Sequence, residues 1–200
     1  MIVVLVYVTR SPDTNEIPEN TAGPPPRRMT ALLPLTAVGS ATREALPQCR
    51  FTIYGAPLFK DRAAEAYYAQ VRTSAVGLPI EFAGWVDDIY ACLAELDLLL
   101  VPSAGHEATT RVILEAFAAG VPVIAFPSGG ISEVVEDDVN GLLAANTEDM
   151  AQRAVELLTG DARRLIAMAQ SARQTWLRRF RPEHSHKLLL QTLEGLIPVE

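Results

Sequence analysis

Two glutamates, Glu107 and Glu115, are the residues of this 200-residue chain whose spacing most directly suggests chemistry. Between Val112 and Ala119 every side chain except that of Glu115 is apolar, so we expect a carboxylate within a mostly buried helix. A buried carboxylate is costly unless a partner bonds to it, and a carboxylate accepts two hydrogen bonds from a sugar diol. Backbone amides at the positive end of the same helix suit phosphate oxygens. These amides belong to Ala108, Thr109 and Thr110. The carboxylates and the amides together indicate a ligand with hydroxyl groups and negative charge.

The surrounding sequence predicts the unit that positions both acids. The apolar run Leu98–Val101 has the length of a buried strand and stops at Pro102. A polar loop and the helix follow, and Gly120 closes the helix in the usual way. Val121–Ala125 is a second apolar run of strand length. The order is therefore strand, loop, helix, strand.

The same alternation extends along the whole chain and predicts an α/β fold. We expect a Rossmann-like, doubly wound parallel sheet with helices on both faces. The other expected strands are 1–8, 50–54, 80–82 and 142–144, and the other expected helices are 29–46, 63–76, 89–95, 131–136, 148–158, 161–180 and 184–197.

In such sheets ligands bind beyond the carboxyl ends of the strands. Five segments that follow expected strands should therefore meet along one edge and form the site. They are Arg10, Gly55, Val86, the loop from Ser103 to Arg111 and the loop 128–130.

These residues resemble the donor-binding half of the group-one, retaining glycosyltransferases with two Rossmann-like domains, the GT-B type. The resemblance covers about residues 50–158. It is carried by Glu107 and Glu115 at their spacing, by the run 116–125 (AFAAGVPVIA) and by Gly129-Gly130, Glu133 and 140–143 (NGLL). By this resemblance Glu107 contacts the transferred sugar and Glu115 contacts the ribose of the nucleotide.

The resemblance also implies how the diphosphate is held. Family members place an arginine after the first strand and a lysine soon after it, and here Arg10 stands at the first place. Arg27 is the nearest match to the second, displaced by a proline-rich stretch, 9–28, that we expect to form a long exposed loop. A guanidinium suits phosphate, but solvated loop arginines at 27 and 28 are an equal alternative.

Three further residues near the expected site have two interpretations each. His106 beside Glu107 could transfer a proton, yet the resembling family uses no histidine there, so a role in hydrogen bonding or lining the site is favoured. Trp85 is interpreted as a core residue, with stacking on a base as the alternative. Glu133 is either a ligand contact or a structural residue.

By the resemblance, residues 1–200 form a single domain that binds a nucleotide-diphosphate sugar. The implied reaction transfers the sugar with retention to an unknown glycan, lipid or small-molecule acceptor and needs no metal or cofactor. In the family an N-terminal domain binds the acceptor, and nothing in residues 1–200 resembles that domain. A C-terminal helix at 183–200 is expected to be available to pack on it, and the chain alone is expected to be inactive. Two rivals stay open: half of a sugar-nucleotide epimerase, and a noncatalytic nucleotide-sugar binding module.

Composition limits the remaining function classes. A formal net charge of −7 argues against a nucleic-acid groove as the main function. Cys49 and Cys92 lack metal-ligand spacing and favour free thiols in a reducing cytoplasm. Residues 1–8 are apolar but too short to span a bilayer. The arginines of 161–180 are interpreted as a solvated face, so membrane association is not indicated.

Overall fold

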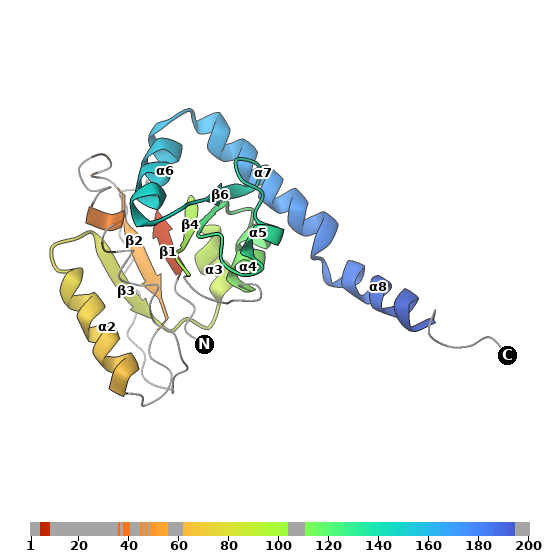
Figure 1. Ribbon diagram of the computed structural model, residues 1–200, viewed down its shortest axis with the longest axis horizontal. Helices are drawn as coiled ribbons and strands as arrows, with labels where there is room; N and C mark the ends of the chain where they lie inside the picture. Colours follow the sequence, from red (N-terminus) through yellow and green to blue (C-terminus); the bar gives the residue numbers. More distant parts are fainter. Residues whose placement is uncertain are drawn as a thin grey trace.

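The computed structural model describes residues 5–8, 36, 38–40, 45, 47, 49–55, 62–103 and 111–194. Within these ranges six strands form one sheet in the order β3-β2-β1-β4-β5-β6 (Figure 1). The strands are β1 (Leu5–Val8), β2 (Phe51–Tyr54), β3 (Ile80–Gly84), β4 (Leu98–Val101), β5 (Val123–Ala125) and β6 (Gly141–Leu143). The helices are α2 (Arg62–Ser74), α3 (Ile89–Ala94), α4 (Arg111–Ala119), α5 (Ile131–Val134), α6 (Thr147–Thr159), α7 (Ala162–Arg179) and α8 (Pro182–Glu194).

The strands share one direction except for β1. Strands β2 and β3 pair in parallel, as do β4 with β5 and β5 with β6. Strand β1 lies between β2 and β4 and is antiparallel to both, so β2 and β4 point the same way. The expected parallel direction is confirmed for five strands and is wrong for β1. An apolar strand has the same pattern in both directions, and the long connection 9–50 permits either one.

The direction of β1 changes the argument for one candidate residue. Val8, at the carboxyl end of β1, pairs with Leu98 at the start of β4. The chain therefore leaves β1 at the edge opposite the carboxyl ends of the other strands. The expectation that Arg10 joins those ends depended on a parallel β1, and that premise is wrong; Arg10 itself lies outside the described residues.

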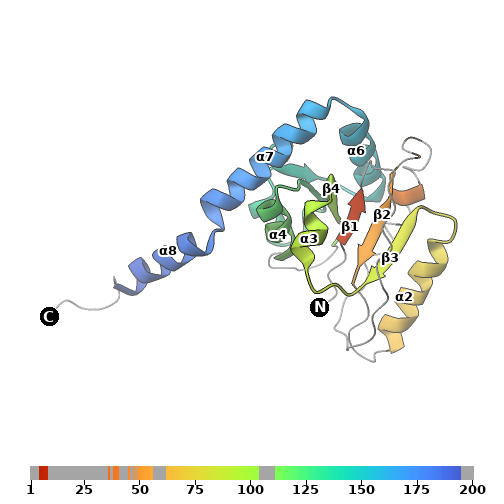
Figure 2. The same cartoon turned by 180° about the vertical axis from the view of Figure 1, so that it is seen from behind.

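Two hydrophobic cores cover the two faces of the sheet, as a doubly wound fold requires. Side chains of a strand alternate between faces, and on β4 Leu98 and Leu100 enter one core while Leu99 and Val101 enter the other. All four are at most 2% exposed. Helices α2, α6 and the first half of α7 pack on the first core (Figure 1). Helices α3 and α4 cover the second (Figure 2), to which α5 and the second half of α7 also contribute. The helices contribute Val71 (α2) and Ala154 (α6) to the first core, and Leu93 (α3), Phe117 (α4) and Ala172 (α7) to the second.

Local residues explain where several helices begin. Helix α3 starts after Asp88, whose carboxylate accepts from two backbone amides of the first turn. Asn146 caps α6, its side chain accepting from the amide of Asp149, so this helix begins at Thr147, one residue before the expected start at 148. Asp161 caps α7. Helix α8 begins at Pro182 rather than two residues later, because proline fits the first turn of a helix.

The last helix projects from the α/β body. Helix α7 packs first against the first core, through Leu165 and Met168, and then against the second core, through Ala172. Helix α8 continues away from the sheet in both views (Figures 1 and 2). On α8 the side chains of Leu189, Leu190 and Leu193 are about half exposed. In the part of the chain that the structure describes, no helix has the length and apolar character needed to cross a bilayer.

Candidate functional site

The carboxyl ends of the parallel strands bring four of the predicted segments to one edge. Gly55 follows β2, Val86 follows β3, Ser103 follows β4 and the loop 128–130 follows β5. The amide of Gly55 donates to the carbonyl of Gly84 at 2.6 Å, which ties the ends of β2 and β3 together. These four segments therefore lie along the same edge of the sheet, and their participation in one site stays a prediction.

Helix α4 carries the described member of the acid pair. Its buried face consists of Val112, Ile113, Ala116 and Phe117, which anchor the helix to the second core. The side chain of Glu115 lies beside this face and is 16% exposed. The helix is therefore less completely buried than its sequence suggested, and the carboxylate lies at the boundary between core and solvent.

Glu115 has an ionic partner on its own helix. The Nε of Arg111 lies 3.0 Å from Oε1 of Glu115, one turn away, and the arginine side chain is 74% exposed. A carboxylate has two oxygens with about four acceptor positions. Bonding through Oε1 therefore leaves acceptor capacity for a ligand. The Arg-x-x-x-Glu spacing was present in the sequence and was the signal that could have identified this pair.

The end of β3 exposes an aromatic ring. Gly84 adopts a φ of 72°, a left-handed conformation that glycine reaches without strain. Trp85, the next residue, is 53% exposed, so its interpretation as a core residue is wrong. Val86 instead packs against the second core. The chain turns at Gly84 and directs the smaller residue inward, which the sequence pattern alone did not specify.

The loop after β5 is a tight turn that leads into α5. The amide of Ser128 donates to the carbonyl of Phe126 at 2.8 Å, and Gly129 adopts a φ of 56°. The side chain of Glu133 in α5 is exposed, while its carbonyl accepts a hydrogen bond from Arg179 at 2.9 Å. A structural role through its backbone is thus observed for Glu133.

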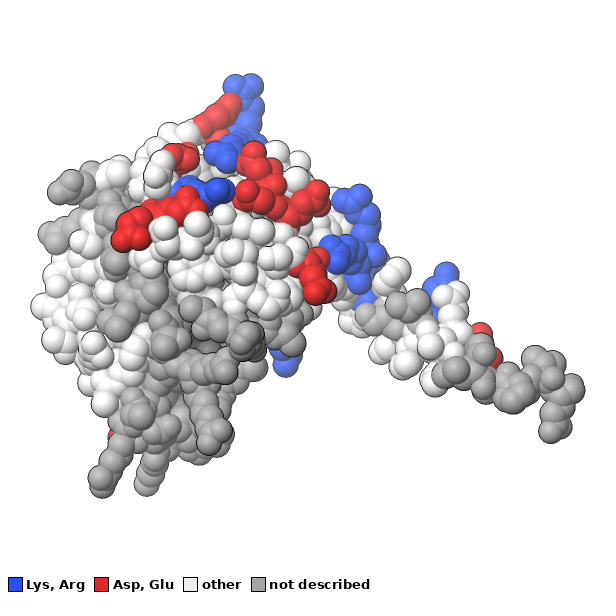
Figure 3. Space-filling view, in the orientation of Figure 1, with Lys and Arg blue, Asp and Glu red and all other residues white. Residues whose placement is uncertain are grey.

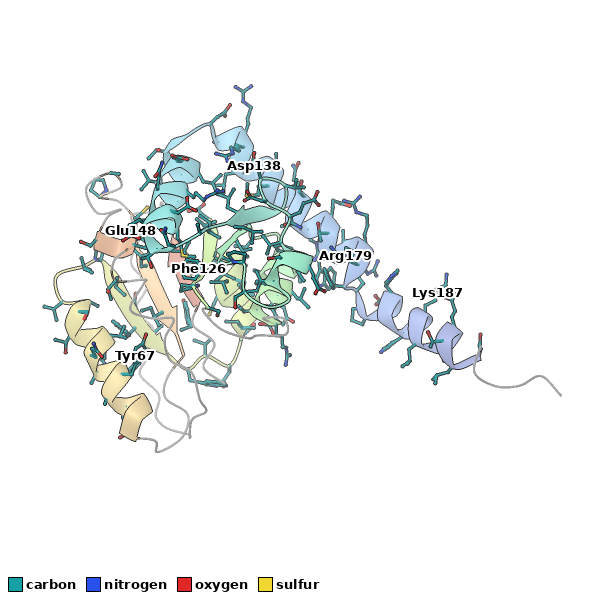
Figure 4. The ribbon with its side chains drawn as sticks, viewed as in Figure 1. Tyr67, Phe126, Asp138, Glu148, Arg179 and Lys187 are labelled. Carbon is teal, nitrogen blue, oxygen red and sulfur yellow. The ribbon has the colours of Figure 1, made fainter. Side chains whose placement is uncertain are left out.

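Helix α7 holds the carboxyl ends of both α4 and α5. Arg173 donates to the carbonyl of Ala118 in α4, and Arg179 donates to that of Glu133 in α5, where α7 passes α5 (Figure 4). Cationic side chains at these positions satisfy carbonyls that lack helical partners. Arg173 also lies over the ring of Trp176, 4.8 Å from its centre. Arg173 is half-buried, so the solvated-face interpretation is wrong for it, whereas the side chain of Arg179 is exposed.

Asn140 is a buried structural residue that sequence reasoning assigned only to a family motif. It is 1% exposed. Its Oδ1 accepts from the amide of Glu136 at 2.8 Å, and its Nδ2 donates to the carbonyl of Val134 and to Oγ1 of Thr175 at 3.1 and 3.2 Å. Asn140 therefore connects the turn before β6 to α7.

Charged side chains gather over α6 and α7 on the face of the molecule that Figure 3 shows. Arg153 bonds Asp149 at 3.0 Å and Asp137 at 3.2 Å, and Arg164 bonds Asp138 at 2.6 Å. The amide of Ala145, and then Arg153, hold the pKa of Asp149 below its usual value of 3.8. Exposed pairs of this kind stabilise a protein only slightly, so we interpret them as surface links between the turn at 137–138 and the helices.

Neither cysteine forms a disulfide within the described residues. Cys49 is buried and Cys92 is half-buried. Burial raises the pKa of both Tyr54 and Cys92, whose side chains are hydrogen-bonded to each other. In the described ranges no group of three or more metal-ligating side chains comes together.

The ligand-binding role of each predicted site residue stays a prediction. Several of these residues fall in ranges that the structure leaves undescribed. They are Arg10, Arg27, His106, Glu107, Ala108, Thr109 and Thr110.

Comparisons with known proteins agree with this arrangement. A family model described as glycosyl transferases, group 1, matches residues 27–160. A lipopolysaccharide core biosynthesis glycosyltransferase of Rhizobium meliloti is 34% identical over 116 residues, which cover 57% of this chain and 34% of that protein. The chain thus spans about a third of the length of this curated relative.

Solved structures have the same fold. The HepE protein of Anabaena in complex with UDP is 25% identical, with a TM-score of 0.75 over 88% of this chain and 48% of that one. The same protein has been solved with UDP-glucose. The C-terminal domain of a group 1 glycosyl transferase of Francisella tularensis is 21% identical, with a TM-score of 0.65 over 78% of this chain and 83% of that one. The doubly wound, Rossmann-like fold expected from the sequence is therefore confirmed.

Proposed function

We propose that this chain, which belongs to the group 1 glycosyl transferases, binds a nucleotide-diphosphate sugar. This sugar nucleotide is the donor from which such an enzyme transfers the sugar. The observation that carries the proposal is Glu115, a partly buried carboxylate on the helix after β4, beside the edge where the parallel strands end. Open α/β sheets bind ligands at this edge. The Anabaena protein of the same fold is solved with UDP and with UDP-glucose.

In this proposal each candidate residue binds one part of the donor. Glu115 accepts hydrogen bonds from the ribose, and Glu107 orients the transferred sugar. Arg10, Arg27 and the amides of 108–110 hold the diphosphate, with Gly55, Val86 and His106 lining the site. Positive groups around the diphosphate stabilise the charge that grows on the departing nucleotide, so the proposed reaction needs no metal.

The proposed transfer retains the configuration of the sugar at its anomeric carbon. Its acceptor binds on a second, N-terminal domain, as the resemblance of the sequence implies. The chain by itself then binds the donor and transfers little.

Calorimetric titration of the chain with UDP, GDP and ADP tests the proposal. We expect one of them to bind, and we expect Glu115→Ala to weaken that binding about tenfold to a hundredfold, because hydrogen bonds to a charged group are lost. Glu156→Ala is the matched control, since Glu156 lies in α6, away from the strand ends, and its exposed carboxylate accepts a hydrogen bond from Gln152. The proposal fails if no diphosphate binds, or if Glu115→Ala binds as tightly as the unchanged chain.

A further inference from the structure

The pair formed by Arg111 and Glu115 has an order that adds little to helix stability. Pairs four residues apart stabilise a helix best when the acid precedes the base, because that order agrees with the helix dipole. In α4 the base comes first, at the first residue of the helix. A cation at this end faces the positive end of the dipole, and the first turn of α4 contains no acidic residue to balance it.

Helix α6 provides the contrasting case within the same chain. There Asp149 precedes Arg153 by four residues, with Nε and Oδ1 3.0 Å apart, in the stabilising order. Asp149 lies in the first turn of α6, where a negative charge is favoured. The α6 pair is thus explained by stability alone, and the α4 pair is not.

The geometry of the α4 pair suits control of the carboxylate. Glu115 is 16% exposed and is fixed by its helix, whereas Arg111 is 74% exposed and approaches from the solvent side. Contact through Oε1 restricts the rotation of the carboxylate. The other oxygen stays available to accept a hydrogen bond from a hydroxyl group. A side chain fixed before binding loses less conformational freedom on binding.

We propose that Arg111 is a positioning residue for ribose recognition, which holds the carboxylate of Glu115 in the orientation that accepts the ribose hydroxyls. This inference rests on the proposed function. Arg111 acts through Glu115, so its removal should weaken recognition of the hydroxyls and leave recognition of the base and the phosphates unchanged.

The test measures how much the ribose hydroxyls contribute to binding. UDP, GDP and the 2′,3′-dideoxy counterpart of each are titrated into the chain in separate experiments. The dissociation constant of the dideoxy nucleotide divided by that of the ordinary nucleotide gives the contribution of the hydroxyls. The ratio should be about tenfold to a hundredfold in the unchanged chain. In Arg111→Ala it should fall by about threefold or more, while the affinity for the dideoxy nucleotide stays the same. Arg111→Lys, which keeps the charge near Glu115, should restore part of the ratio.

Controls separate positioning from other roles. Arg153→Ala, which breaks the α6 pair, should leave the ratio unchanged, and thermal melting of each variant checks that it folds. An unchanged ratio in Arg111→Ala overturns the proposal. Equal weakening of both nucleotides also overturns it, because Arg111 would then bind the phosphates directly. If the unchanged chain binds a diphosphate without regard to its hydroxyls, the assignment of Glu115 to the ribose fails first and the positioning role fails with it.

Discussion

Replacement of Asn140 by alanine should destabilise the protein more than any single change on its exposed surface. Asn140 is 1% exposed and makes three hydrogen bonds, to Glu136, Val134 and Thr175. Alanine removes all three and leaves the amide of Glu136 and the carbonyl of Val134 without this partner. The turn before β6 then loses its connection to α7.

The magnitude follows from the number of bonds. At roughly 0.5–1.5 kcal/mol for each bond, Asn140→Ala should lower the free energy of unfolding by about 3 kcal/mol. In a domain of this size that corresponds to a fall in Tm of about 6–12 °C. Thr175→Val removes the bond from Asn140 that crosses to α7 and also the bond that Oγ1 of Thr175 donates to the carbonyl of Ser171 at 2.9 Å, so its cost should be about 1–2 kcal/mol.

Urea denaturation followed by circular dichroism measures both variants and the double variant. The two changes share a bond, so their combined cost should fall short of the sum by about 1 kcal/mol. The reasoning would be refuted by a loss below about 1 kcal/mol for Asn140→Ala, or by costs that simply add.

Two further predictions concern the same region. A Cβ at Gly141 would lie 2.7 Å from the carbonyl oxygen of Val123 on the neighbouring strand. Gly141→Ala should therefore lower the free energy of unfolding by about 1–3 kcal/mol. A denaturation curve that matches the unchanged chain would contradict this. The pKa of Asp149 is lowered in the folded chain, chiefly by the amide of Ala145, so its stabilising effect is present above the ordinary value of 3.8 and disappears as the pH falls through the lowered pKa. The difference in unfolding free energy between the unchanged chain and Asp149→Asn should therefore shrink from about pH 5 downward, and a difference that is constant with pH would be inconsistent with this carboxylate as the titrating group.

The elements of the fold could be predicted from the sequence because their signals are local. The apolar run of β4, the punctuation of α4 by Gly120 and the alternation of strands with helices each depend on neighbouring residues. The direction of β1 could not be predicted in this way, because pairing between distant segments decides it. The exposure of Trp85 likewise depends on the conformation of Gly84, whose carbonyl accepts a hydrogen bond from Gly55 in a distant segment of the chain.

The candidate site was predictable to a similar degree. Glu115 stood out as a single charge in an apolar helix, and its position beside the sheet edge follows from the order of strands. Its bond to Arg111 is equally local, because residues four apart are neighbours on the surface of a helix. Asn140 was assigned to a motif, and its structural role depends on Thr175, which is 35 positions away in the sequence.

The position of β1 has a consequence for how the sheet assembles. In the described residues the sheet contains two groups of parallel strands. One group is β2 and β3, the other is β4, β5 and β6, and within each group the strands follow one another in the sequence. Only β1 joins the two groups by hydrogen bonds. Both of its partners are remote in the chain, and closure of long loops slows folding. We therefore expect the two groups to form first and the N-terminal segment to enter between them last, so that weakening this one strand would leave two separately ordered halves instead of a continuous sheet.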